Sequence, residues 1–519
     1  MATKKFTEYS NIPHSQDETQ LLQPATEPEQ NEDDKGNDEC PPELQLFRWE
    51  NVLIPACYLC VGLTQGLNRP LLNVYPLDLG ANESQQATIG LVLMIPATMK
   101  IIFGFLSDNF PILGYRRKSY MLIGWLSVTF IMILLHQNSD LRMAYNEYGD
   151  AVPPKDAPSV ELVSITFLVS SIGMWMADVM GDSIVAEKAR LEPKSRKGQL
   201  QSTCYASRFF GMMVAAPLST VMYSHYGPGS VVLLIACTPL PIVPILFAFS
   251  ESKARPSQPI KEHLTEIWHA VCFRAVWQPL GFLYFFNLLQ VQNSAWRQYL
   301  STVLDFTAQE LNWLLVASYI FTFVGTMAYK EYFLKTSWRR VYQFCILTNG
   351  LLTCTQLLLI KGKTFGLSNF WFSLGDDAAQ EFISGVQFLP ASIMIVNLCP
   401  PGSEGASYAL YTTMWNVGMI LAPSISSVLL SIWDVSVEAL EAGNLDGLFK
   451  LSLLTAVIKT SPIFLLFLLP QTRDQLFDMT AKPSVLGGTI FLLVLFGSMF
   501  YIIVVGILNI VDPGWAGAS

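Results

Sequence analysis

Long apolar segments limit the folds open to this chain. A helix that crosses the roughly 30 Å hydrocarbon core of a bilayer needs about 20 apolar residues, and about thirteen such stretches follow residue 50. Lipid offers no partner to a backbone amide, so each must be helical. With 51% hydrophobic and 14% charged residues, the sequence predicts an all-α polytopic membrane protein. The expected spans are 51–75, 86–108, 118–136, 160–184, 203–224, 230–249, 276–302, 309–329, 340–360, 379–398, 406–432, 448–469 and 485–510.

Basic residues between the spans predict the orientation. Lysine and arginine are enriched in cytosolic loops. With the N-terminus in the cytosol, the cytosolic connections hold eighteen basic residues and the opposite loops hold five. This asymmetry, more than threefold, alternates loop by loop.

The spans predict a division into two six-helix bundles. We expect them at 49–250 and 276–470, joined by a cytosolic linker, 251–275. Apolar residues of the linker recur at helical spacing, which is typical of an amphipathic helix on the membrane surface. Residues 471–519 contain a further linker and the thirteenth segment, which we expect to cross the membrane as an accessory helix against the bundles.

Residues 1–48 differ from the rest of the chain. They hold eleven acidic and four basic residues, and they supply most of the net charge of -9. Such a composition is typical of a disordered segment. We therefore expect an acidic cytosolic tail, and the net charge says nothing about nucleic acid, which we do not expect as a partner.

The tail carries two patterns that sorting adaptors recognise. One joins Tyr9 to Ile12, and the other joins Asp17 to the pair Leu21 and Leu22. These patterns favour an endosomal, lysosomal or vacuolar membrane, and the plasma membrane is the alternative. Asn82 lies in an Asn-x-Ser sequence of the first outer loop, so it is a candidate glycosylation site.

A charged turn follows the second span. Gly104 allows two helices to approach closely, and four residues later comes Asp108, followed by a basic turn with Arg116 and Arg117. We predict that these residues form a charged gate at the cytosolic surface. The alternative is that the charges only set the topology.

The two halves of the chain show a faint internal repeat. The first span carries three polar residues near its outer end, and the seventh carries a similar set, as expected where two halves share a site. We predict that these residues bind substrate: Gln65, Asn68, Arg69, Gln290, Asn293 and Arg297. The alternatives are hydrogen bonding between helices for the amides and contact with the outer interface for the arginines. A glycine followed by a basic turn also occurs in both halves, at Gly104 and at Gly325. In the second copy, Tyr329 stands in the place of Asp108.

Several charged residues lie inside expected spans, where insertion costs about 2.5 to 3.5 kcal/mol each. Lys100 lies in the second span, Asp178 and Asp182 share one face of the fourth, and Arg208 lies in the fifth. We predict a Lys100–Asp178 ion pair, with Lys100 and Arg208 as further substrate-binding residues. Alternatively, one carboxylate takes up a proton that drives transport, and Lys100, Asp178, Asp182 and Glu187 form a proton-coupling or charge-relay set. Lys459 in the twelfth span has no evident partner.

The sequence contains no pattern for metal binding, covalent catalysis or ATP hydrolysis. Most of the nine cysteines lie in or beside spans, and the five histidines have no repeated spacing. No Gly-rich loop with lysine and serine or threonine is present. We therefore expect no cofactor, no metal and no enzymatic activity, and any transport to be secondary.

Three separated motifs resemble the folate-biopterin transporter family of the major facilitator superfamily. The first runs from Pro96 to Arg117, the second from Ala177 to Glu187 with Gly198–Ser202, and the third from Cys399 to Gly418. The resemblance covers roughly residues 50 to 470.

This resemblance implies a major-facilitator-type fold of two six-helix bundles that works by alternating access. The expected partners are a small organic solute such as folate or biopterin, protons for symport, and membrane lipid. Some members of the family carry S-adenosylmethionine, a cation that would favour Asp178 and Asp182 as its site. A membrane sensor or scaffold that no longer transports is a further alternative.

Overall fold

The computed structural model describes residues 44–81, 83–145, 151–193, 196, 198–253, 259–400, 403–471, 473–480 and 483–511. The predicted sorting patterns and Asn82 lie outside these ranges. The described chain is almost entirely helical, as predicted. In its first half the helices are α2 Leu53–Asn73, α3 Tyr75–Asp78, α4 Glu83–Thr98, α5 Lys100–Asn109, α6 Lys118–Asn138, α7 Val160–Ala189, α8 Gln199–Tyr226, α9 Pro228–Cys237 and α10 Ile242–Ala248.

The amphipathic helix predicted in the linker is present as α11 Ile260–Cys272. The second half consists of α12 Arg274–Leu288, α13 Trp296–Thr302, α14 Ala308–Ala328, the π-helix η4 Tyr329–Phe333, α15 Trp338–Ile360, α16 Asn369–Leu398, α17 Glu404–Leu430, α18 Val437–Glu441, α19 Asp446–Thr460, the 3-10 helix η5 Ser461–Leu468, α20 Arg473–Thr480 and α21 Val485–Val511. A short antiparallel pair, β1 Ala144–Tyr145 and β2 Ala151–Val152, lies in the loop before α7.

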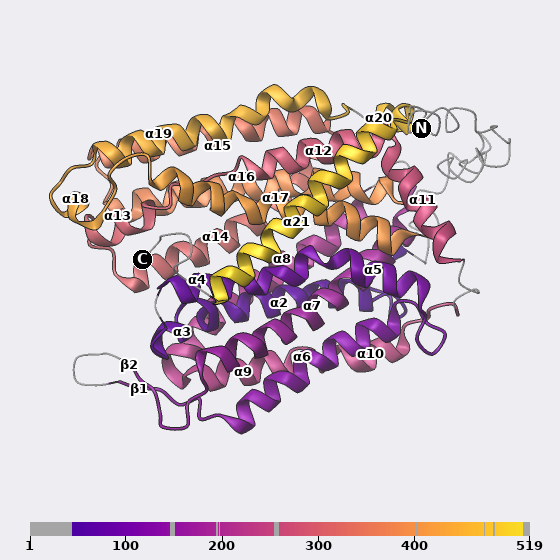
Figure 1. The fold of residues 1–519 in the computed structure, drawn as a ribbon, viewed down its shortest axis with the longest axis horizontal. Helices are drawn as coiled ribbons and strands as arrows, with labels where there is room; N and C mark the ends of the chain where they lie inside the picture. Colours follow the sequence, from indigo (N-terminus) through magenta and orange to yellow (C-terminus); the bar gives the residue numbers. More distant parts are fainter. Residues whose placement is uncertain are drawn as a thin grey trace, which may run out of the picture.

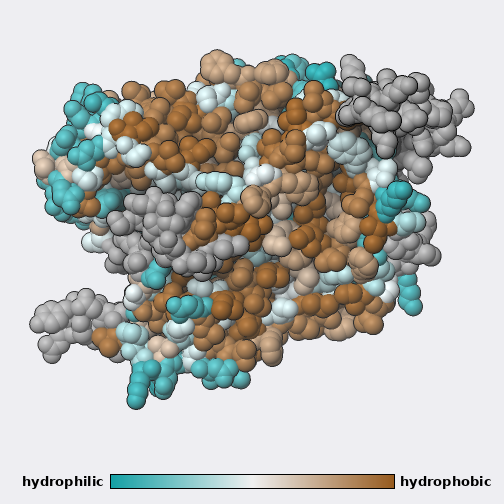
Figure 2. Space-filling model, in the orientation of Figure 1, coloured by the Kyte–Doolittle hydropathy of each residue, from teal (hydrophilic) through white to brown (hydrophobic). Residues whose placement is uncertain are grey.

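Most of the long helices run side by side along the long axis of the molecule (Figure 1). Within the described ranges, nine are long and apolar enough to cross a membrane, and the α4–α5 pair, bent by 42°, makes a tenth. The other three expected spans are α2 and α8, which carry the polar residues described below, and the broken pair α12 and α13. Hydrophobic side chains cover the middle of the face in Figure 2, and hydrophilic ones gather at its two ends.

The sequence explains where several long helices begin. Ser159 precedes α7 and accepts a hydrogen bond from the amide of Leu162. Thr307 and Glu310 form a reciprocal capping box at the start of α14. Each of these side chains satisfies an amide that has no partner inside the helix.

Small residues bring helices into close contact. A Cβ atom on Gly62 of α2 would lie 1.9 Å from the main-chain oxygen of Arg208 on α8. A Cβ atom on Gly124 of α6 would lie 2.5 Å from the oxygen of Gly173 on α7. Close backbone approach of this kind is a common way to pack helices in lipid, where the hydrophobic effect gives little drive.

Two predictions about helix limits were wrong. The seventh span is not one helix, because α12 ends at Leu288 and α13 begins only at Trp296. The tenth span begins at Asn369, ten residues earlier than expected. Its N-terminal part contains two aspartates, which the sequence pattern had assigned to a loop.

The thirteenth apolar segment forms α21, which crosses the other helices obliquely (Figure 1). Gly487 packs on Trp277 of α12, Gly488 packs on Cys272 of α11, and a Cβ atom on Gly506 would lie 3.4 Å from Ile95 of α4. Helix α21 thus contacts both halves of the chain. It lies against the bundles, as expected of an accessory helix.

Candidate functional site

The charged residues predicted inside the membrane come together in the first half of the chain. Lys100 begins α5 directly after the bend at Met99, and α7 and α8 supply its neighbours. We call Lys100, Asp178, Asp182 and Arg208 the Lys100 network. All four residues are buried.

The Lys100–Asp178 pair predicted from the sequence is formed. The Lys100 Nζ lies 2.6 Å from Asp178 Oδ2 and 3.6 Å from Asp182 Oδ2. On its other side, Asp178 Oδ1 lies 3.0 Å from Arg208 Nη1. Two cations therefore face two carboxylates, which is the balance that buried charges require.

Neutral side chains complete the Lys100 network. Asp182 accepts a hydrogen bond from the Tyr58 hydroxyl at 2.5 Å, and Arg208 Nε donates to the side-chain oxygen of Gln65 at 3.3 Å. The ring of Trp175 lies 4.5 Å from Lys100 Nζ, within the range of a cation–π contact. The sequence pattern did not single out Tyr58 or Trp175, because neither carries a charge.

An aromatic layer connects the Lys100 network to the second half of the chain. Tyr58 packs edge-on against Tyr205 of α8 at 5.3 Å, and Tyr205 packs against Phe388 of α16 at 4.7 Å. Phe388 in turn contacts Trp415 of α17, and the hydroxyls of Tyr205 and Tyr408 lie 3.3 Å apart. The two bundles are therefore in direct contact beside the Lys100 network.

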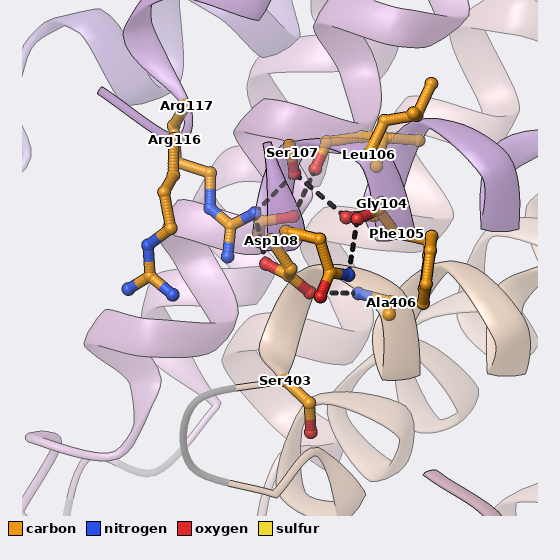
Figure 3. A network of polar contacts seen from close by, with 12 residues as sticks. Gly104, Phe105, Leu106, Ser107, Asp108, Arg116, Arg117, Ser403 and Ala406 are labelled. Carbon is orange, nitrogen blue, oxygen red and sulfur yellow. Dashed lines mark hydrogen bonds and ion pairs between the residues drawn. The ribbon is translucent and has the colours of Figure 1, made fainter. Parts of the chain in front are cut away.

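A second charged group lies where α5 ends (Figure 3). Asp108 Oδ1 lies 2.6 Å from Arg117 Nη1, and Arg117 Nη2 lies 3.0 Å from Glu187 Oε1. Asp108 Oδ2 accepts a hydrogen bond from the main-chain amide of Ala406 on α17 at 2.7 Å. We call Asp108, Arg117, Glu187 and the Ala406 amide the Asp108 cluster. It joins the first bundle to the N-terminus of a helix in the second.

Close backbone packing and another ion pair surround the Asp108 cluster. A Cβ atom on Gly104 of α5 would lie 2.4 Å from the main-chain oxygen of Gly405 on α17. Nearby, Arg190 Nη1 lies 2.8 Å from Glu404 Oε1, and Arg190 Nη2 donates to the oxygen of Cys399. The molecule is thus held closed between α5 and α17 on this side.

Three predicted gate residues belong to this region, but Arg116 does not join the ion pairs. Its main-chain amide donates to Glu251 at 2.9 Å, and its side chain points away from Asp108 (Figure 3). Glu187, predicted with Lys100, Asp178 and Asp182 as part of a proton-coupling or charge-relay set, pairs with Arg117. A helical turn and a half separates Glu187 from Asp182, which is enough to place it at the other cluster.

The predicted substrate-binding residues of the first span lie near the Lys100 network or toward the second half. Gln65 contacts Arg208, as described above. The side-chain oxygen of Asn68 is buried and has no hydrogen-bond partner among the described residues. The guanidinium of Arg69 lies 5.2 Å from the ring centre of Tyr319 on α14.

The matching residues of the seventh span do not join that group. Gln290 and Asn293 lie in the break between α12 and α13, so they do not lie together on one helical face. Asn293 Nδ2 donates to Ser452 of α19 at 2.8 Å, and its oxygen accepts from the amide of Ala295. Arg297 is exposed on α13. For Asn293 the structure matches the alternative of hydrogen bonding between helices.

The internal repeat has diverged at the Gly-plus-basic turn. Gly325 packs on Phe382 within the second bundle, whereas Gly104 packs on Gly405 across the two bundles. Arg339 donates to the main-chain oxygen of Leu469, and the buried Tyr329 hydroxyl has no hydrogen-bond partner among the described residues. Only the first copy of the turn therefore joins the bundles.

The structure also reveals acidic residues on α16 that the sequence analysis did not single out. Asp376, Asp377 and Glu381 lie inside this helix, and Lys459 of α19 acts electrostatically on all three. We call the three carboxyls the α16 acidic cluster. These three residues could have been found from the sequence, because they are charged and lie in or next to an apolar segment. The expected span, however, began after the two aspartates.

Within the part of the chain that the structure describes, no group of three or more His, Cys, Asp or Glu side chains is arranged to hold a metal ion.

Comparison with known proteins places this architecture in a family. The family model described as the BT1 family matches residues 62–485. The chain belongs to the BT1 family. The match covers both bundles and reaches the first residue of α21.

Curated relatives of this BT1 family member span most of its length. It is 26% identical over 443 residues to the folate-biopterin transporter of Synechocystis sp., covering 84% of this chain and 85% of the relative. It is 22% identical over 389 residues to folate transporter 1 of Plasmodium falciparum, covering 74% and 72% of the two chains. These relatives are transporters and not enzymes, which agrees with the prediction of no enzymatic activity.

Among solved structures, the human organic anion transporter MFSD10 (TETRAN) has a similar fold. The TM-score is 0.57 at 15% identity, covering 82% of this chain and 100% of that one. At this identity the likeness concerns the fold alone. The major-facilitator-type fold expected for this BT1 family member is thereby confirmed.

Proposed function

We propose that this protein is a secondary transporter that carries a folate- or pterin-like solute across a membrane by alternating access. The observation that carries the proposal is the Lys100 network. It is buried next to the aromatic layer where the two bundles meet, which is where carriers of this kind bind their solutes. Rocking of the bundles about such a site would expose it to each side in turn.

The chemistry of the Lys100 network suits an anionic substrate with a flat ring. Folate carries two carboxylates. Lys100 and Arg208 both pair with Asp178, and each could bind a substrate carboxylate in its place. Trp175 lies beside Lys100 and offers an aromatic face to a pterin. Gln65 and Asn68 supply amide groups for the ring edge, and the names of the relatives in Synechocystis and Plasmodium support the same substrate class.

The Asp108 cluster would act as the gate on one side. The positive-inside rule favours the cytosol for this side, and it places the N-terminus there as well. In this arrangement the structure corresponds to a carrier closed toward the cytosol. Proton coupling is part of the proposal, since the interior holds several carboxyl groups that could exchange protons. The membrane is the plasma membrane or an endosomal, lysosomal or vacuolar one.

The test is uptake into vesicles that contain the purified protein. Labelled folate, biopterin and S-adenosylmethionine compete with and without an imposed pH gradient. We expect saturable folate uptake that the gradient increases and that the Lys100→Gln and Arg208→Gln variants lose. Uptake of S-adenosylmethionine alone would favour a cation carrier, and uptake of none of the three would favour a sensor. Saturable folate uptake that survives both substitutions would exclude the Lys100 network as the binding site.

A further inference from the structure

The α16 acidic cluster has no part in the proposed substrate site. Asp377 and Glu381 are four residues apart and therefore lie on one face of the helix. Two cations face two carboxylates in the Lys100 network, whereas one lysine of the same bundle faces the three carboxyls of α16. The second bundle therefore carries an excess of acid in its interior.

Lys459 of α19 completes this group. Lys459 as a whole residue is only 9% exposed, and no hydrogen bond or ion pair joins its ammonium to another described residue. It acts electrostatically on Asp376, Asp377 and Glu381. The group therefore holds one lysine and three carboxyls. A bound proton would offset part of this excess of negative charge.

The three carboxyls differ in their partners. Asp376 accepts hydrogen bonds from Thr355 and, at 2.9 Å, from Gln380. Glu381 accepts one from Thr322 at 3.1 Å. Asp377, by contrast, has no hydrogen bond or ion pair with another described residue. Asp376 and Glu381 both act electrostatically on Asp377, and a proton bound among the three carboxyls relieves the repulsion between like charges.

We infer that the α16 acidic cluster and Lys459 form a proton-binding site, in which Asp377 and Glu381 share the bound proton. The role of this site in coupling rests on the proposed function, whereas proton binding itself does not. A proton suits the site better than a metal cation, because the ammonium of Lys459 repels a metal ion among the same carboxyls.

The site also reaches the other bundle. Arg69 of α2 interacts electrostatically with Glu381 and lies over the ring of Tyr319 on α14. An ionised Glu381 attracts this arginine, and a protonated one does not. Among the residues that the structure describes, the charged or titratable groups that act on the cluster are Lys459, Arg69 and Tyr319. Proton binding therefore weakens the attraction between Glu381 in the second bundle and Arg69 in the first. Coupling requires such a link between proton binding and the relative position of the bundles.

The first experiment needs no substrate. Dicyclohexylcarbodiimide adds to protonated carboxyl groups in apolar surroundings, and the adduct is located by mass spectrometry of the full-length protein in lipid nanodiscs. We expect adducts on Asp377 or Glu381 that decrease as the pH rises, and none on Asp178 or Asp182. In the Lys459→Gln variant the adducts should still form at higher pH, at a proton concentration roughly tenfold lower than in the wild type. The reason is that the positive charge of Lys459 no longer favours ionisation of the carboxyls.

Controls make this result decisive. Asp377→Asn should remove the pH-dependent labelling of Asp377 and reduce that of Glu381. Asp446→Asn, an exposed carboxyl at the first position of α19, should change nothing. Labelling that does not depend on pH, or that occurs on α7 in place of α16, overturns the inference. Loss of labelling when sodium replaces potassium at fixed pH also overturns it, because the site would then bind sodium.

The second experiment tests coupling in vesicles. Asp377→Asn should retain folate exchange at equal pH but lose accumulation driven by a pH gradient, and Glu381→Gln should behave alike. Accumulation equal to wild type in both variants overturns the role in coupling and leaves the proposed function intact. Absence of folate exchange in the wild type argues against the proposed substrate, and the labelling result then decides on the proton site alone.

Discussion

The carboxylate of Asp108 caps a helix that belongs to the other bundle. Its Oδ2 accepts a hydrogen bond at 2.7 Å from the amide of Ala406, the third residue of α17. Amides in the first turn of a helix lack internal partners, and the helix dipole favours a negative charge there. Because Arg117 holds the other oxygen, the same carboxylate connects the turn after α5 to α17.

We predict that Asp108→Asn weakens closure on this side. It removes the negative charge at the α17 N-terminus and weakens the hydrogen bond from the Ala406 amide, which together contribute about 1–2 kcal/mol to closure. Cys399, buried at the end of α16, is a natural reporter in a variant without the other eight cysteines. Its reaction with a polar thiol reagent should become roughly tenfold faster.

Arg116→Ala is the matched control for this measurement. Arg116 is the neighbour of Arg117 in the chain, but its side chain makes no ion pair within the described residues. Its removal should leave the reaction rate of Cys399 unchanged. Equal rates for Asp108→Asn and wild type would contradict the role of the Asp108 cluster in closure.

We expect Gly104→Ala to hinder closure by a steric route. The new methyl group would lie 2.4 Å from the backbone oxygen of Gly405, and overpacking of this kind costs about 1–3 kcal/mol. Folate uptake should fall while the helix content measured by circular dichroism stays constant. Gly90→Ala on α4 meets nothing within 4 Å and should transport normally. Normal uptake by both variants would show that α5 and α17 need not approach so closely.

Lys100→Met should lower the thermal stability. It leaves the buried Asp182 with Tyr58 as its remaining close partner, and breaking a buried ion pair costs about 3–5 kcal/mol. The double variant Lys100→Met/Asp182→Asn restores the charge balance, so its melting temperature should recover. Folate uptake should not recover, since the cation is still missing. If the single variant melts like wild type, the charges are less buried than described.

Asn293→Ala separates a structural role from substrate binding. Asn293 bonds to Ser452, so its loss should reduce stability by about 1 kcal/mol without changing the KM for folate. Ser452→Ala should have a similar effect, and the double variant should be less destabilised than the sum of the two. A raised KM in Asn293→Ala alone would return this residue to the substrate site.

Periodicity and charge predicted the parts of this protein that depend on local sequence. Lys100 and Asp178 could be paired from the sequence because a lone charge inside an apolar helix must find an opposite one. The fold class followed from helices that lipid makes obligatory. Residues that contribute through the main chain could not be found in this way, and the amide of Ala406 is the main example.

The errors have physical causes as well. The break at residues 289–295 escaped notice because the surrounding residues keep a helical pattern, while Asn293 bonds to α19 and to its own backbone. Helix α16 was drawn too short because Asp376 and Asp377 resemble loop residues. Their neighbours Thr355 and Lys459 come from α15 and α19, and only the tertiary structure brings them together.

Helix α21 has a consequence for any relative motion of the two halves. Its 27 residues span about 40 Å. Its start fits tightly against Trp277 and Cys272, while its far end touches Ile95 at ordinary van der Waals distance. When the two halves move relative to each other, α21 should move together with α12, and its C-terminal end should slide over α4. Fluorophores on α21 and α4 would then change their separation in each transport cycle, whereas a pair on α21 and α12 would keep theirs.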